Sequence, residues 1–439
     1  MSLPRGHRKL IRAWAFYDWA NSVYSLVISS AIFPIFYVAL TVAKDKNGVV
    51  VSDTVEFLGY SFNNDSLISY VTAFAFLCIS IFSPILSGIA DYVGNKKFFM
   101  QFFCYLGALS CIGLYWFDLE NLWFGLLCYF FGLIGFWGSI VFYNSYLPDI
   151  AYKEQQDKAS ALGFSLGYIG SVLLLLLCLA MILSYESFGF QSEAEPTRLS
   201  FILTGIWWFG FSQYTYRVLP KGFKKNKYSK DVFFNGFKSL KKVSFKVKEN
   251  LQLARFLPAF FVYSMAVQTI MIVATYFGNK EINWGESGAT TGLIVSILLI
   301  QIVAIAGAAF AAKLAIKVGN IKVLLGIHII WIGVCVFAFF MQTPTDFYIA
   351  AFFVGLVMGA IQSLSRSTYS KMIPSTEKDT TSFFSFYDVT EKLGIVVGMF
   401  TYGLIAQLTG NVRYSIIFLS LFFIISVILL LRIPKKLAI

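Results

Sequence analysis

The stretch Trp14–Tyr37, WAFYDWANSVYSLVISSAIFPIFY, decides the fold, because it is long and apolar enough to cross a bilayer yet carries an acid. At about 3.6 residues per turn, Asp18, Asn21, Ser22 and Ser25 fall on one stripe of a helix. A charged side chain inside a spanning helix costs roughly a few kcal/mol, so it rarely faces lipid. We therefore expect a spanning helix whose polar stripe faces a protein interior or a wet cavity. The alternative is that Asp18 lies near the headgroups and only caps the helix start.

The composition is that of a multi-pass membrane protein. Of the 439 residues, 58% are hydrophobic and 13% are charged, whereas about a quarter of a soluble chain is charged. We predict an all-α protein with spanning helices at 13–41, 67–90, 98–117, 122–147, 159–183, 200–219, 253–277, 288–312, 321–341, 347–372, 383–409 and 413–432.

Basic residues are distributed unevenly between the predicted loops. If both termini are cytoplasmic, most of the 35 Lys and Arg residues fall in cytoplasmic segments, and only Lys44, Lys46, Arg198, Lys280 and Arg413 fall outside. Because basic loops stay on the cytoplasmic side, we expect a protein of the cell (inner) membrane with both termini in the cytoplasm. The same bias explains the net charge of +12 without a nucleic-acid partner.

A basic segment divides the predicted helices into two sets of six. We expect an N-terminal half at 1–219, a basic cytoplasmic linker at 220–252 and a C-terminal half at 253–439. Lysines interleaved with Val and Phe in the linker suggest a short amphipathic helix lying on anionic lipid, and a solvated linker is the equal alternative. Two halves of six helices also suggest an internal repeat.

Separate motifs carry a resemblance to a known family. Residues 88–97, GIADYVGNKK, are similar to the signature loop between the second and third spans of the major facilitator superfamily. YDWANS at 17–22, GAIQSLSRS at 359–367 and FFSFYD at 383–388 resemble the autophagy-related vacuolar-effluxer-like family within that superfamily. The resemblance implies a major-facilitator-like fold of twelve helices in two six-helix halves. It also implies export of small polar solutes, with amino acids as the first guess.

The signature loop is the predicted gate, whose candidate residues are Gly88, Asp91, Gly94, Lys96 and Lys97. The two glycines permit a tight turn and a close helix approach. Asp91 can face the positive N-terminal end of a neighbouring helix, and the resemblance implies that this neighbour is the eleventh span, beginning near Ser382. Breaking that contact would shift the balance between conformations. The alternative is a loop that only sets the geometry of the turn.

Ionisable side chains inside the predicted spans suggest proton coupling. The acids are Asp18, Asp388 and Glu391, and the bases are Arg366 and Lys392. One carboxylate is in excess, and in a low-dielectric cavity a proton neutralises it at the lowest cost. Asp18 is the first choice, because no base lies within one turn inward of it, whereas Lys392 should hold Asp388 ionised. The alternative is a set of shallow groups neutralised by water and headgroups.

Several spans carry polar groups that suit a small polar solute. The substrate-binding candidates are Asn21, Ser25, Asn144, Gln268, Gln362, Arg366 and Lys392. The two bases are candidate anchors for a substrate carboxylate. Hydrogen bonding between helices is an equal alternative for uncharged groups.

No motif indicates an enzyme, a cofactor or a metal site, since the six cysteines are dispersed in apolar runs and no nucleotide-binding fingerprint is present in a suitable context. We expect a monomeric secondary active transporter that exports or exchanges a small polar solute by alternating access, with membrane lipids and protons as further partners. The alternatives are a lipid or glycolipid flippase and a non-transporting receptor or scaffold. A sealed core with Asp18 and Asp388 both ion-paired would favour the scaffold.

Overall fold

A computed structural model describes residues 3–44, 50–222, 232–285 and 288–434, so part of the predicted basic linker lies outside the described residues. The first spanning segment is continuous and consists of α1 (Arg8–Val23), the π-helix η1 (Tyr24–Ala31) and α2 (Ile32–Thr41). It is followed by α3 (Asn64–Val93), α4 (Lys96–Gly113), α5 (Leu122–Asn144), α7 (Lys153–Leu183) and α8 (Ala194–Val218). After α9 (Val232–Glu249) come α10 (Leu251–Glu281), α11 (Ala289–Val318), α12 (Asn320–Phe340), α13 (Pro344–Met372), α14 (Thr380–Thr409) and α15 (Val412–Leu431).

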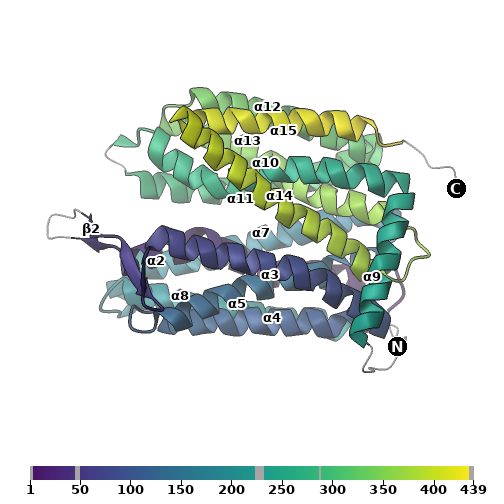
Figure 1. Cartoon of the computed structure of the whole chain (residues 1–439), viewed down its shortest axis with the longest axis horizontal. Coiled ribbons are helices and arrows are strands. Elements are labelled where there is room, and N and C mark those ends of the chain that lie inside the picture. Colours follow the sequence, from purple (N-terminus) through teal and green to yellow (C-terminus); the bar gives the residue numbers. More distant parts are fainter. Residues whose placement is uncertain (1–2, 45–49, 223–231, 286–287, 435–439) are drawn as a thin grey trace.

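The remaining elements are short. They are the helices η2 (Leu114–Trp116), α6 (Leu147–Ile150) and η3 (Tyr185–Phe188), and the strands β1 (Ala43–Lys44), β2 (Val50–Ser52), β3 (Thr54–Phe57) and β4 (Tyr60–Asn63). The strands pair as two antiparallel ladders, β1 with β2 and β3 with β4. Both ends of the described chain lie at one end of the bundle, which we call the terminal end (Figure 1). The strands lie at the opposite end, which we call the hairpin end.

Eleven segments of the described chain are long and apolar enough to cross a membrane. The helix α8 supplies the twelfth span: it packs alongside α1 and α4, but its Trp, Tyr, Ser and Gln residues lower its hydropathy. The twelve predicted spans are therefore found, each within a few residues of its predicted bounds except where polar turns extend a helix.

The spanning helices form two groups of six that lie one above the other in Figure 1, with α7 next to α11 and α3 next to α14. The two large clusters of buried apolar side chains follow the same division. One cluster is built from residues 10–219, and the other is built from residues after 242 together with Tyr168. A small third cluster, Ala161 with Ala308 and Ala312, joins the halves. We call the two groups the first and second halves; the domain limits at 219 and 253 stay predictions.

Small residues set the closest helix contacts. A Cβ atom on Gly359 of α13 would lie 2.1 Å from the Ala304 carbonyl oxygen of α11, and one on Gly307 of α11 would lie 2.1 Å from the Leu356 carbonyl oxygen. Side chains at these positions would push the two backbones apart. The α11–α13 pair thus forms a closely packed support for the polar residues at the terminal end of α13.

The polar stripe of the first span differs from its predicted form. Asp18 and Asn21 are buried, but Ser25 is exposed, because the wide π-helical turns of η1 rotate the face that a regular helix would continue. Ser30 donates a hydrogen bond to the Ser25 carbonyl within this segment, at 2.9 Å. The stripe therefore ends near Ser22, and Ser25 does not join the buried cluster described below.

Candidate functional site

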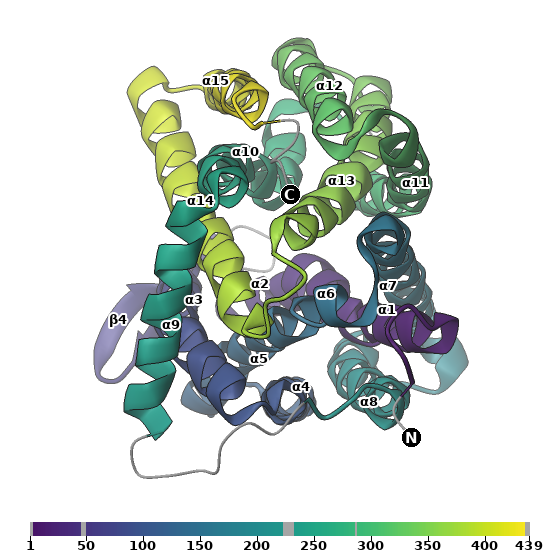
Figure 2. The same ribbon diagram turned by 90° about the vertical axis from the view of Figure 1, so that its right-hand side faces the viewer.

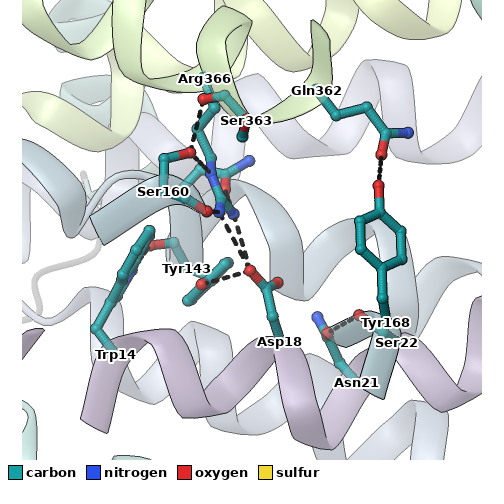
Figure 3. A network of polar contacts seen from close by, with 11 residues as sticks. Trp14, Asp18, Asn21, Ser22, Tyr143, Ser160, Tyr168, Gln362, Ser363 and Arg366 are labelled. Carbon is teal, nitrogen blue, oxygen red and sulfur yellow. Dashed lines mark hydrogen bonds and ion pairs between the residues drawn. The ribbon is translucent and has the colours of Figure 1, made fainter. Parts of the chain in front are cut away.

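A buried ion pair joins the two halves inside the bundle (Figure 3). Both terminal nitrogens of the Arg366 guanidinium on α13 lie 3.2 Å from Oδ2 of Asp18 on α1, and the two side chains are only 4% and 9% exposed. The Tyr143 hydroxyl on α5 donates a further hydrogen bond to the same carboxylate oxygen at 2.8 Å. Because a buried charge needs a partner and hydrogen bonds, Asp18 and Arg366 each depend on the opposite half.

All five N–H groups of Arg366 are used. Besides its two contacts with Asp18, it donates to Ser160 Oγ (2.9 Å), to the Ser160 carbonyl (2.9 Å) and to Asn144 Oδ1 (3.2 Å). Its guanidinium carbon lies 4.1 Å from the ring centroid of Phe164 and 4.9 Å from that of Trp14. A planar fork of donors suits this arrangement, which the single ammonium of lysine cannot reproduce.

The cluster requires a glycine beside it. A Cβ atom on Gly163 of α7 would lie 2.5 Å from Asp18 Oδ2 and 2.9 Å from a terminal nitrogen of Arg366. The missing side chain leaves the space in which carboxylate and guanidinium meet, so α7 approaches α1 closely at this level.

Asp18 is not the unpaired carboxylate that helical spacing predicts. A base does face Asp18, but it comes from α13, 348 residues further along the chain, and helical spacing within the first span contains no information about it. Asn21 is buried too; its Nδ2 has no hydrogen-bond partner among the described residues, and its Oδ1 lies 3.5 Å from Ser22 Oγ.

A second ion pair lies on α14, between Asp388 and Lys392, as their spacing predicts. Both side chains are buried, and the Ser83 hydroxyl of α3 lies 3.5 Å from the Asp388 carboxylate. The Lys392 ammonium lies 5.1 Å from the ring centroid of Trp137 on α5. This pair therefore sits where α14 crosses the first half.

Glu391 differs from the other two acids. It has no ion pair among the described residues, and its Oε1 accepts a hydrogen bond from Gln268 Nε2 of α10 at 2.7 Å. Both side chains are half-buried. The predicted excess carboxylate is thus Glu391. Nearby, the Tyr168 hydroxyl of α7 donates to Gln362 Oε1 of α13 at 2.7 Å, a further contact between the halves (Figure 3).

The predicted partner of Asp91 is confirmed. Its Oδ2 accepts a hydrogen bond from the backbone N–H of Ser382 at 2.6 Å, and its Oδ1 accepts one from that of Thr381 at 3.3 Å. These groups belong to the first turn of α14, where backbone N–H groups lack partners within the helix. Gly94 adopts φ +74° to turn the chain after α3, and Gly88 packs against Gly236 of α9. The gating role of these residues stays a prediction.

The two gate lysines differ in their contacts. Lys96 forms an ion pair with Asp149 (2.7 Å) and donates to the Ser145 carbonyl (2.8 Å) and to Thr380 Oγ1 in the second half (3.0 Å). Lys97 donates to the Leu219 carbonyl at 2.9 Å and thus connects α4 with the end of α8 within the first half.

Sequence reasoning missed a third connection at the terminal end. Asp157 of α7 forms an ion pair with Lys371 of α13 and accepts a hydrogen bond from Asn320 Nδ2 of α12 at 2.8 Å. The predicted fifth span begins only at residue 159, but α7 begins at Lys153, where Gln155 Oε1 caps the Tyr152 N–H. The helix-forming residues of KEQQDK were a usable signal for this extension. No pattern in the sequence singles out Tyr143 and Ser160.

Comparisons with known proteins agree with this architecture. Residues 6–438 match the family model described as "Vacuole effluxer Atg22 like". The uncharacterized MFS-type transporter YxiO of Bacillus subtilis is 32% identical over 428 residues, which cover 97% of this chain and 94% of the relative. Autophagy-related protein 22 of Eremothecium gossypii is 28% identical over 321 residues, covering 65% of this chain and 60% of the relative.

Solved structures share the fold at low sequence identity. The major facilitator transporter FucP in the outward conformation matches with a TM-score of 0.69 at 14% identity, covering 98% of this chain and 99% of that one. The proton:xylose symporter XylE matches with a TM-score of 0.68 at 12% identity, covering 97% and 95%. The predicted twelve-helix major-facilitator-like fold is confirmed.

Proposed function

The chain belongs to the Atg22-like vacuole effluxer family of major facilitator transporters, and from this premise we propose that it moves a small polar solute by alternating access as a secondary active transporter. It is a multi-pass membrane transporter, not an enzyme. The observation that carries the proposal is the buried Asp18–Arg366 pair, whose members lie on opposite halves. Asp18 and Asp388 are both ion-paired, which is the arrangement expected of a non-transporting scaffold, but membership of a transporter family favours transport.

The contacts described above hold the terminal end closed. Opening it requires that Arg366 leave Asp18, Asn144 and Ser160, which belong to the first half. A buried charge without a partner is unfavourable by several kcal/mol, so these groups resist separation unless something replaces their partners. A solute that enters the cluster can do so, and its binding would then favour the conformational change.

The charges of the pair favour a zwitterionic solute. A carboxylate can accept the bidentate hydrogen bonds of Arg366, and an ammonium group can donate to Asp18. An amino acid carries both groups, and one molecule of it would therefore satisfy both sides of the separated pair. Gln268, Gln362 and Lys392 lie deeper along their helices and would contact the remainder of such a solute.

We propose Glu391 as the proton site, in place of Asp18. Asp18 and Asp388 each have a base as partner, whereas Glu391 accepts a hydrogen bond from a neutral amide. At 1.5 Å per residue it lies about 16 Å from the start of α14, near the middle of a hydrocarbon core that is ~30 Å thick. Titratable groups at this depth are characteristic of ion pathways.

The proposed orientation places the terminal end in the cytoplasm of a cell with the chain in its inner membrane, because Lys and Arg are concentrated there. Export or exchange is the proposed direction. The test is a screen of labelled amino acids and other small polar solutes in proteoliposomes, with and without an imposed pH gradient. We expect exchange of at least one zwitterionic solute and its accumulation when a gradient is imposed. Lipid scrambling without movement of any solute would instead identify a flippase.

A further inference from the structure

The helix α9 lies across the terminal end instead of along the bundle. In Figure 1 the spanning helices run horizontally and α9 runs vertically, and Figure 2 shows it at the edge of the bundle beside α3 and α14. It packs against α3 of the first half and against α10 and α14 of the second half. In a bilayer that the spanning helices cross, α9 therefore lies parallel to the membrane surface at the level where α3 ends.

One face of α9 is fixed to the bundle. Gly236, Val243 and Val247 are buried, and a Cβ atom on Gly88 of α3 would lie 2.2 Å from the Gly236 carbonyl oxygen. Toward its C-terminal end, Lys246 forms an ion pair of 2.6 Å with Glu377, which lies just before α14. The helix is thus held by backbone contact to one half and by an ion pair to the other.

The opposite face of α9 is apolar and basic at once. Phe233, Phe234, Phe237 and Phe245 are 53–66% exposed, and Lys238, Lys241, Lys242 and Lys248 are exposed among them. At about 100° per residue, the four phenylalanines and four lysines interleave over the half of the helix that faces away from the bundle. We call this set of eight residues the outward face of α9.

We propose that the outward face of α9 docks on an anionic membrane surface. Water alone would leave four large aromatic rings exposed on one short helix, whereas the interface between headgroups and acyl chains accepts aromatic rings and lysine ammonium groups on the same face. Four exposed lysines against one exposed acid, Glu249, give this side of α9 a net positive charge, and anionic lipid attracts clustered basic residues near the bilayer surface. The position of α9, parallel to the membrane at the edge of the bundle, brings this face to that interface.

Docking also connects the lipid to the gate. Gly88, which abuts α9, lies three residues before Asp91, and Glu377, the ion-pair partner of Lys246 on α9, lies in the segment that leads into α14. A lipid-bound α9 therefore stabilises the arrangement in which α3 and α14 meet at the terminal end. The docking itself does not rest on the proposed transport function, and it is tested without measuring transport.

The experiment measures the immersion of α9 in vesicles of phosphatidylcholine, with or without phosphatidylglycerol. A spin label is placed on the full chain at Phe237→Cys, in a Cys78→Ser background because the other five cysteines are buried. We expect phosphatidylglycerol to raise the accessibility of the label to oxygen and to lower its accessibility to a water-soluble nickel chelate. A second label at Phe245→Cys should report the same shift.

Neutralising the four lysines of the outward face to glutamine should abolish the shift caused by phosphatidylglycerol. The matched control neutralises Lys153, Lys158, Lys313 and Lys317, four exposed lysines at the terminal end but not on α9, and it should keep the shift. The proposal is overturned if both labels remain accessible to the nickel chelate in anionic vesicles. It is also overturned if both labels are inaccessible to oxygen and to the nickel chelate, because that pattern would indicate burial under a protein partner. Equal loss of the shift in both four-lysine variants would also overturn it, since the effect would then follow net charge alone.

Discussion

At the scale of single residues, the Arg366 side chain makes more hydrogen bonds than that of any other candidate predicted from sequence. Its five hydrogen bonds reach Asp18, Asn144 and Ser160, so α13 is bonded to α1, α5 and α7 through one side chain. The sequence identified Asp18, Arg366 and Asn144 as candidates because polar groups in spanning helices are costly without a role. It could not show that they meet, because their contact depends on how distant helices pack.

This network predicts a specific pattern of stabilities. Arg366→Gln leaves the Asp18 carboxylate buried without a base, and we expect a loss of about 3–5 kcal/mol in the free energy of unfolding. Asp18→Asn should cost a similar amount by stranding Arg366. The double variant should be more stable than the sum of the single losses predicts. Thermal unfolding in detergent measures all three, and strictly additive losses would show that the two groups do not interact.

Glu391 carries the prediction for proton coupling. Glu391→Gln keeps the size of the side chain and a hydrogen bond to Gln268 but cannot take up a proton. We expect this variant to exchange solute at equal pH on both sides and to lose accumulation driven by a pH gradient. Asp388→Asn is the matched comparison, since it strands Lys392 in the membrane and should impair both activities. If Glu391→Gln accumulates solute as fully as the parent protein, the proton site lies elsewhere.

At the scale of elements, the largest departures from the sequence prediction are local changes of helix geometry. Periodicity of 3.6 residues extends the polar stripe of the first span to Ser25, but η1 is π-helical and turns Ser25 away. The low hydropathy of the residues before 159 left Asp157 outside the predicted fifth span. The helix α7 nevertheless begins at Lys153, and its first turns are polar. Hydropathy identifies the part of a helix that crosses lipid, but it does not predict the residue at which the helix begins.

The contact between α3 and α14 gives the prediction for the gate. Asp91 accepts hydrogen bonds from two backbone N–H groups in the first turn of α14. Such a contact with a helix N-terminus is worth up to ~2 kcal/mol when partly buried. Asp91→Asn keeps the shape and removes the charge, so we expect a folded protein with slower transport and greater reagent access to a cysteine at the terminal end. Unchanged transport and access would leave Asp91 with a purely structural role in the turn.

At the scale of the whole molecule, the sequence determined the number of spans and their grouping into two sets of six. Hydrophobic segments about 20 residues long have few alternatives to a spanning helix, and the basic segment between the sixth and seventh spans separates the sets. The pairing of α7 with α11 and α13, and of α3 with α14, could not be predicted from one sequence. Such pairings depend on the shapes of entire helix faces.

Orientation is tested by labelling in intact cells. Single cysteines at Arg198 and Lys280, at the hairpin end, should react with an impermeant reagent added outside, and those at Lys97 and Lys378 should react only after permeabilisation. Lys46, on the predicted outer side, and Lys230, in the predicted basic linker, lie outside the described residues. The reverse pattern would place the terminal end outside and would contradict the cytoplasmic assignment of the basic linker.

The central claim is that the terminal end must open for transport, and a reversible cross-link tests it most directly. Asp157→Cys on α7 and Lys371→Cys on α13 replace an ion pair between the halves, and a short bifunctional thiol reagent that can be cleaved by reduction should join them. Each single-cysteine variant treated alike is the control. We predict that the joined protein loses solute exchange in proteoliposomes and regains it on reduction. Undiminished exchange by fully cross-linked protein would contradict the account.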